Sequence, residues 1–179
     1  LVWAVAGNRV MISNTVVLDG GWFTDPNVFD RVFDIFAPAL VIISGMTIQH
    51  GNPGNGGTQG GAIRNAGTLT LQDVVITNSR ANQGGAIANT GQLTLSNVTL
   101  SGNKANGTGS SIQGGGLWNG STTTTTGHVI LTNVTISSNA ANGGPGAGGG
   151  IYNQGYLQGT GLSVTNNNAN FGGGGIFSV

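Results

Sequence analysis

The chain has 179 residues, of which 35 are glycine and only 6% are charged, and its formal net charge at neutral pH is zero. An ordinary globular surface carries far more charge, so this surface must consist mainly of Thr, Ser, Asn, Gln and Gly. Such a surface argues against electrostatic capture of nucleic acid or anionic membranes, and the absence of cysteine excludes disulfides and thiolate metal sites.

The N-terminal segment, LVWAVAGNRV, contains a short apolar run with no basic residue before it and no cleavage-site context, so we do not expect a signal peptide. No stretch approaches the roughly 20 apolar residues of a membrane span, and we expect no insertion into a membrane. Val10, Ile12 and Val17, followed by Leu18, predict a first coil of short strands.

An acidic and aromatic segment, GWFTDPNVFDRVFD, follows and is the least repetitive part of the chain. Asp25, Asp30 and Asp34 lie in it, and their neighbours Trp22, Phe23 and Phe29 are compatible with a sugar or cation site. The alternative, which we favour, is a loop that packs its aromatic side chains onto the early coils. Residues 1–34 would then form an irregular N-terminal coil and loop, and residues 35–179 regular coils of a single domain.

A repeat of about 24 residues organises the rest of the chain. Its clearest copies run from Gly60 to Gln83, GGAIRNAGTLTLQDVVITNSRANQ, and from Gly84 to Gly107, GGAIANTGQLTLSNVTLSGNKANG. Later copies open at Gly115 and Gly149, and a last, incomplete one opens at Gly174. Upstream, the pattern places Ile35 over Ile63, Val41 and Ile43 over Leu69 and Leu71, and Met46 and Ile48 over Val74 and Ile76. A fixed period of this length is typical of a solenoid.

Apolar residues recur two positions apart in each copy, which is the spacing of one face of a strand. These columns contain Ile63, Ile87, Leu117, Ile151 and Ile176; Leu69 and Leu71 with Leu93, Leu95, Val129 and Leu131; and Val74 and Ile76 with Val98, Leu100, Val134, Ile136, Leu162 and Val164. Because one coil cannot bury its own apolar face, stability must come from stacking parallel strands about 4.8 Å apart.

Asparagines also recur in columns, at positions where the chain must turn. One column contains Asn65, Asn89, Asn119 and Asn153, and another contains Asn82, Asn106, Asn142 and Asn170. Asn tolerates left-handed backbone, and stacked amides can form hydrogen bonds from layer to layer. The sequence therefore predicts asparagine ladders at the corners.

The pattern GGAIxNxGxLTLxNVTLSGNxA resembles the right-handed parallel β-helix repeats of bacterial secreted and surface proteins, of the polymorphic outer-membrane protein and pectate-lyase-like types. The resemblance covers the chain from about Val10 onward. It implies an all-β, right-handed, single-stranded parallel β-helix of about six coils and a secreted or cell-surface location. It does not select a function, because adhesins, passenger domains and carbohydrate-active enzymes share this fold.

Few residues are suited to catalysis or metal binding. The chain has no Glu, and its two histidines, His50 and His128, fall at corners of different coils. A glycosidase needs two carboxylates that face one bond, and the regular coils do not offer such a pair. We therefore predict no enzymatic activity, no catalytic or cofactor-binding residues, no metal site and no cofactor.

Insertions and outward columns are candidates for contact surfaces. Loops without charges or aromatics occupy residues 52–59, 107–113, 121–127 and 143–148, and we expect them to be spacers.

Outward Thr and Ser rows, such as Thr99, Thr135 and Ser163, resemble ice-binding faces, although solubilising residues are the simpler interpretation. Trp118, Tyr152 and Phe177 form one outward column, which predicts an exposed aromatic ladder. Four Asn-x-Ser/Thr glycosylation sequons occur, at Asn97, Asn106, Asn119 and Asn133. Because Asn and Thr are abundant in this chain, chance matches to this motif are expected.

Our prediction is a noncatalytic, extracellular structural or adhesive module that assembles end to end. The copy that starts at Gly174 breaks off after Val179, which would leave an uncapped layer. We expect a head-to-tail homo-oligomer, or further coils of a longer chain, with a glycan or cell-surface ligand as a candidate partner. The assembly interface would contain Val2, Trp3, Val5, Ile176, Phe177 and Val179. The alternatives are a carbohydrate-active β-helix enzyme and an ice-binding protein.

Overall fold

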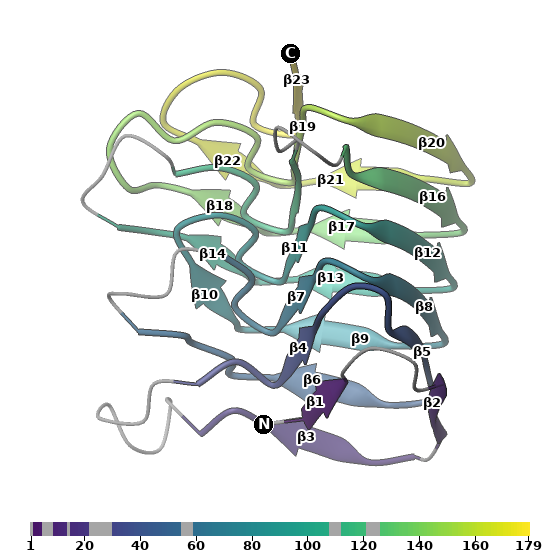
Figure 1. The fold of residues 1–179 in the computed structure, drawn as a ribbon. Coiled ribbons are helices and arrows are strands. Elements are labelled where there is room, and N and C mark those ends of the chain that lie inside the picture. Colours follow the sequence, from purple (N-terminus) through teal and green to yellow (C-terminus); the bar gives the residue numbers. More distant parts are fainter. Residues whose placement is uncertain are drawn as a thin grey trace.

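The computed structural model describes residues 2–4, 9–13, 15–21, 30–54, 59–107, 112–120 and 126–179. Every regular element among them is a β-strand, and the strands form a parallel solenoid of about five turns. Figure 1 shows the strands stacked in layers from the N-terminal coil to the C-terminal coil. The predicted all-β parallel β-helix is confirmed.

Four parallel sheets, A to D, run along the solenoid axis. Each coil contributes one strand to each of sheets A, B and C, except the last, which contributes only β23 to sheet A. Sheet A contains β1 (Val2–Ala4), β4 (Phe33–Ile35), β7 (Ile63–Asn65), β11 (Ile87–Asn89), β15 (Leu117–Asn119), β19 (Ile151–Asn153) and β23 (Ile176–Ser178). Sheet B contains the five-residue strands β2 (Arg9–Ser13), β5 (Leu40–Ser44), β8 (Thr68–Gln72), β12 (Gln92–Ser96), β16 (His128–Thr132) and β20 (Tyr156–Thr160).

The remaining strands form the other sides of the coils. Sheet C contains β3 (Val17–Asp19), β6 (Thr47–Gln49), β9 (Val75–Thr77), β13 (Thr99–Ser101), β17 (Thr135–Ser137) and β21 (Ser163–Thr165). Sheet D contains the two-residue strands β10 (Arg80–Ala81), β14 (Lys104–Ala105), β18 (Ala140–Ala141) and β22 (Asn168–Ala169). Sheets B and C contain six strands each, and the solenoid has about five turns, where the sequence predicted about six coils.

The register of the strands follows the sequence repeat through most of the chain. Leu93 pairs with Leu69 below it and with Val129 above it. The predicted placement of Ile35 over Ile63 is wrong: Phe33 lies over Ile63, and Ile35 lies over Asn65. A shift of two residues keeps the same face of the strand inward, so the apolar pattern could not distinguish the two registers. In the first coil Leu18 packs inward over Ile48, whereas Val17 is 57% exposed.

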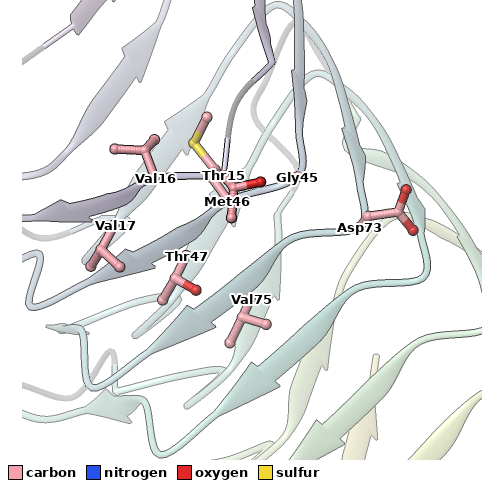
Figure 2. Close-up of a pocket in the computed structure, with 8 residues that line it drawn as sticks. All are labelled: Thr15, Val16, Val17, Gly45, Met46, Thr47, Asp73 and Val75. Atoms are coloured by element: carbon pink, nitrogen blue, oxygen red, sulfur yellow. The ribbon is translucent and has the colours of Figure 1, made fainter.

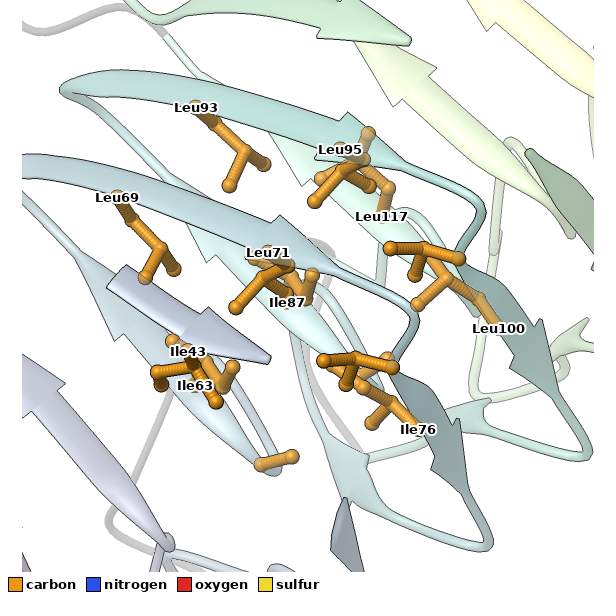
Figure 3. Close-up of a cluster of buried hydrophobic side chains, with 14 of the residues drawn as sticks. Ile43, Ile63, Leu69, Leu71, Ile76, Ile87, Leu93, Leu95, Leu100 and Leu117 are labelled. Atoms are coloured by element: carbon orange, nitrogen blue, oxygen red, sulfur yellow. The ribbon is translucent and has the colours of Figure 1, made fainter. Parts of the chain in front are cut away.

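The core is a continuous stack of aliphatic side chains inside the coils. Figure 3 shows Leu69 next to Leu93, Leu71 next to Leu95, and Ile76 next to Leu100 on successive layers. All six are essentially buried, as predicted for the inward columns. The predicted inward position of Val98 is confirmed as well. Because each layer covers the apolar face of the next, burial increases with every added coil.

A buried asparagine ladder follows sheet A, as predicted. The side-chain amide of Asn65 donates to Asn89 (2.7 Å), Asn89 donates to Asn119 (2.9 Å), and Asn119 donates to Asn153 (2.8 Å). The ladder begins at Asn65 because Ile35 occupies the position below it. Each amide therefore has partners inside the coil, as a buried polar group requires.

The second ladder lies at another position from the one predicted. Asn103 donates to Asn139 and Asn139 to Asn167, each at 3.0 Å, at the turn between sheets C and D. The predicted column contributes no amide ladder among the described contacts: Asn170 donates to the backbone oxygen of Asn142 instead. Both columns contain asparagines at the repeat spacing, and only the direction of the side chain separates an inward ladder from an exposed one.

The paired glycines that open each copy have two different roles. Gly84 has φ +65°, and a Cβ atom there would lie 2.1 Å from the backbone oxygen of Ile87. Gly85 has ordinary backbone, but its Cβ would lie 2.2 Å from the backbone oxygen of Gly115 in the next coil. The first glycine allows the turn, and the second allows two coils to approach closely.

Candidate functional site

The aromatic column of sheet A is a stack, but it is not the exposed ladder that the sequence predicts. Tyr152 pairs in register with Trp118 below and with Phe177 above, and the rings of Tyr152 and Phe177 stack with centroids 5.5 Å apart. Trp118 and Tyr152 are only 4% and 6% exposed, and Phe177 is partly buried.

Neighbouring corners cover this column, which explains the error. Trp118, Tyr152 and Ala88 cluster with Ala147 from the corner before β19. The indole nitrogen of Trp118 donates to Gln113 Oε1 at 3.1 Å, so its polar atom also has a partner. A residue that points away from the solenoid interior can therefore still be buried under a corner, and the aromatic column is a second, smaller core.

Two members of the predicted acidic cluster, Asp30 and Asp34, lie among the described residues, whereas Asp25 and the aromatics at 22, 23 and 29 lie outside them. Asp34 is 2% exposed and pairs with two arginines. Arg31 Nη1 lies 2.7 Å from Asp34 Oδ2, and Arg64 contacts both oxygens, at 2.7 and 2.8 Å. Asp34 is thus occupied by a buried ion-pair network rather than presented to a substrate.

The arginines of this network are held by further contacts. Arg31 donates to the backbone oxygens of Gln59 and Gly60, and the guanidinium of Arg64 lies 5.2 Å from the centre of the Phe36 ring. Burial lowers the pKa of Arg31, and the charge of Asp34 opposes that effect. The network joins β4 to β7 and to the corner at Gln59, so its role is to fasten the early coils together.

The two histidines lie far apart in the fold and in different surroundings. His50 Nδ1 is 3.0 Å from Asp19 Oδ2, and Gln49 donates to the same carboxylate at 2.9 Å. Desolvation acts to raise the pKa of Asp19, but hydrogen bonds from Gln49, the Gly21 N–H and His50 outweigh it, and the pKa is lowered.

His128 begins β16 instead of occupying a corner, and its ring stacks on the ring of Tyr156 with centroids 4.2 Å apart.

One hollow lies on the outer face of sheet C. It has a volume of about 260 Å³, and Figure 2 shows Val17, Thr47 and Val75 in line on β3, β6 and β9, with Asp73 at the neighbouring corner. The Thr and Ser rows continue from there over Thr99, Thr135 and Ser163, at outward positions as predicted. Valines interrupt the row at its N-terminal end, so its surface chemistry is mixed.

A second groove lies at the turn between sheets C and D and has a volume of about 530 Å³. Its lining includes Arg80 and Lys104, which are direct partners on β10 and β14. The sequence pattern did not predict this groove, because the two cations are isolated in the chain and only the 24-residue repeat brings them together. A column comparison of charged residues would have found them.

The proposed assembly residues lie at opposite ends of the solenoid. Val2 and Trp3 belong to β1, and Val5 lies outside the described residues. At the other end Ile176 is 41% exposed and Val179 is 69% exposed, while Phe177 is partly buried against Tyr152. The strands of the two ends are the outermost members of their sheets.

Within the described ranges, no group of three or more His, Cys, Asp or Glu side chains is arranged to hold a metal ion. The same part of the chain contains no helix long and apolar enough to cross a membrane. In comparisons with family models, curated proteins and solved structures, we found no match to this chain.

Proposed function

We propose that this chain is a noncatalytic structural or adhesive segment of a secreted or surface β-helix, of the polymorphic outer-membrane protein or pectate-lyase-like type, in bacteria. In this proposal, copies stack head to tail through their end layers. The observation that carries it is the C-terminal layer of the described residues. Among those residues, β20, β21, β22 and β23 each pair with a strand on one side.

The C-terminal layer keeps most inward apolar positions of the internal layers, although Gly159 stands in the column of Leu95 and Leu131. Leu157, Leu162 and Val164 continue the inward columns of the core and are only partly buried, because no further coil among the described residues lies over them. Exposed edge strands combined with an apolar surface favour pairing with more β-structure. A second copy can supply parallel strands of matching length: three, five and three residues in β1, β2 and β3 match β23, β20 and β21.

The sheet order restricts how two copies can join. Sheet A has seven strands, whereas sheets B and C have six. If β1 of the next copy paired with β23, β2 would lie two layers, or about 9.6 Å, from β20 and could not pair with it. If β2 and β3 pair with β20 and β21, β1 and β23 compete for one position in sheet A.

We favour the joint through β20 and β21. It pairs strands of five and three residues, whereas the joint through β23 pairs one strand of three. β1 of the following copy would then be displaced. Deleting residues 1–6 distinguishes the two joints, because it removes β1. The joint through β23 has β1 as its only contact, so it would be lost. The joint through β20 and β21 would lose only the strand that competes with β23, so it would persist.

Assembly is tested with a proline on the open edge. In Gly159→Pro, the ring and the missing N–H on β20 block pairing from outside, and Gly159→Ala is the matched control. We expect the parent and the alanine variant to form filaments in electron micrographs and large species in sedimentation, and the proline variant to stay monomeric with an unchanged circular dichroism spectrum. A parent protein that stays monomeric at high concentration would contradict the proposal.

The other functions can be tested on the same material. Degradation of any member of a polysaccharide panel by the parent, but not by an Asp30→Asn/Asp34→Asn variant that still folds, would favour the enzyme. Thermal hysteresis would favour ice binding through the Thr rows of sheet C. Either result would replace the noncatalytic structural proposal.

A further inference from the structure

We infer that Asn142 is a self-modifying site, at which the backbone nitrogen of Gly143 converts the side-chain amide into a carboxylate. The dipeptide Asn-Gly occurs four times in the chain, and three copies, at Asn106, Asn119 and Asn142, lie among the described residues. In this dipeptide the glycine nitrogen can attack the preceding amide, because glycine has no side chain to obstruct a five-membered ring. The three copies differ in their surroundings, and the differences select Asn142.

The reaction needs water as its only co-reactant. The nitrogen of Gly143 bonds to Cγ of Asn142 and loses its proton to solvent, while the bond between Cγ and Nδ2 breaks and releases ammonia. The product is a cyclic imide. Water then opens the imide at one of its two carbonyl carbons, which leaves either aspartate or isoaspartate at position 142. The net change is the hydrolysis of one amide, with no oxidation or reduction.

The surroundings of Asn142 leave both reacting groups available. Asn142 follows β18 at an exposed corner, where Gly143, Gly144 and Pro145 form no strand. Within the described part of the chain, the Gly143 N–H donates no hydrogen bond, and neither does Nδ2 of Asn142, the leaving group. Asn168 Nδ2 lies 3.4 Å from Oδ1 of Asn142, the oxygen on which negative charge develops during the attack.

Asn119 belongs to the same dipeptide, but the buried ladder holds both of its reacting groups. Its Nδ2 donates to Asn153 Oδ1 at 2.8 Å and also to two backbone oxygens. The attacking nitrogen, that of Gly120, donates to the Asn89 backbone oxygen at 2.9 Å. Both groups would have to leave buried partners before they could react, which requires the coil to open.

Asn106 is exposed like Asn142, but the next coil covers its glycine. A Cβ atom on Gly143 would lie 2.5 Å from the backbone nitrogen of Gly107 and 2.4 Å from its oxygen, so Gly143 packs directly on Gly107. The attacking nitrogen therefore has less room to rearrange there. We expect Asn142 to react fastest, Asn106 more slowly, and Asn119 only in the unfolded chain.

The modification changes the charge of this corner with time. The chain has five acidic and five basic residues, so one new carboxylate changes the formal net charge from zero to −1. Asn168 Nδ2, which contacts the Asn142 side chain, can donate to the new carboxylate. The corner thus acquires a hydrogen-bonded negative charge, and the fraction of modified chains records the age of the protein.

Peptide mapping of the folded parent protein, incubated in mildly alkaline buffer at physiological temperature, measures the three sites separately. We expect the peptide that contains Asn142 to gain about one mass unit and to separate into two chromatographic forms, with aspartate and with isoaspartate. The peptide that contains Asn119 should stay unmodified until urea unfolds the protein, after which it should react like the others. Asn142→Gln is the matched control, because it keeps an amide but lengthens the ring that must close.

Hydroxylamine gives a second readout, because it opens the imide and cleaves the chain at that point. The folded parent should yield fragments 1–142 and 143–179, and Asn142→Gln should yield neither. Equal rates at all three sites in the folded protein would place the reaction in unfolded chains and overturn the inference. Faster reaction at Asn106 than at Asn142, or cleavage of Asn142→Gln between the same two residues, would overturn it as well.

Discussion

Asp34 on β4 and Arg64 on β7 form a two-bond ion pair across adjacent coils, in which Arg64 Nε and Nη2 contact the two carboxylate oxygens at 2.7 and 2.8 Å. Arg31 adds a third contact to Asp34 at 2.7 Å. The pair occupies the same outward column of sheet A in which later coils place Ala88, Trp118 and Tyr152. One column is therefore buried by charge pairing at one end and by aromatic packing at the other.

The first prediction concerns this network. Asp34→Asn removes the charge that compensates two partly buried arginines, so we expect the free energy of unfolding to fall by about 3 kcal/mol. This is the low end of the range for a broken buried ion pair, because the side chain of Arg64 is about a third exposed. Asp73→Asn is the control, because Asp73 is exposed and its left-handed backbone suits Asn. Urea unfolding measures both, and equal stability of the two variants would contradict a structural role for the network.

The second prediction concerns the inward columns. Val98 is buried in the stack, so Val98→Asp places an unpaired charge in the core, and we expect loss of the folded solenoid rather than a local defect. Thr94→Asp, at an exposed position of the same coil, should unfold like the parent. Circular dichroism during heating distinguishes the outcomes, and a cooperative transition of Val98→Asp at the parent temperature would show that the inward column is wrongly placed.

The third prediction concerns the asparagine ladder that the structure reveals. Asn103 donates to the Ile76 backbone oxygen and to Asn139, and it accepts a hydrogen bond from the Ser79 N–H. Asn103→Ala removes these three side-chain hydrogen bonds inside the coil, and each buried group that is left unpaired costs roughly 1–3 kcal/mol. Asn97→Gly should cost much less, because Asn97 is exposed and Gly accepts its positive φ. If chemical denaturation ranks the two variants in the opposite order, the buried ladder is not a main source of stability.

The fourth prediction is a pH dependence at Asp19. Its pKa is lowered from the ordinary value of 3.8, so its contacts stabilise the fold above pH 3.8 and lose that contribution as the pH falls through the lower pKa of the folded state. A carbon-13 NMR titration of the carboxyl group measures this pKa. Gln49→Ala removes one of the hydrogen bonds that lower it and should move the pKa upward. A carboxyl group that titrates above 3.8 in the parent would contradict the assignment.

The sequence by itself could predict the coil because the repeat makes every layer chemically similar to the next. Leu69, Leu93 and Val129 occupy one column in the sequence and one column in the structure, since parallel pairing in register is the arrangement that superposes identical strands. The Asn65 ladder was predictable for the same reason. The placement of Ile35 was not, because a two-residue shift preserves the inward face, and the register there depends on pairing with β7.

The sequence alone thus determined the fold class, the repeat, the inward columns and one buried ladder, all of which follow from periodicity along the chain. Which outward residues are covered, and which distant charges meet, depends on how each coil packs against the next. Trp118 is buried because Ala147 and Tyr152 pack against it, Asp34 is neutralised because Arg64 lies one coil above it, and Arg80 adjoins Lys104 because β10 pairs with β14. These contacts depend on corners and neighbouring layers, which a strand pattern does not encode.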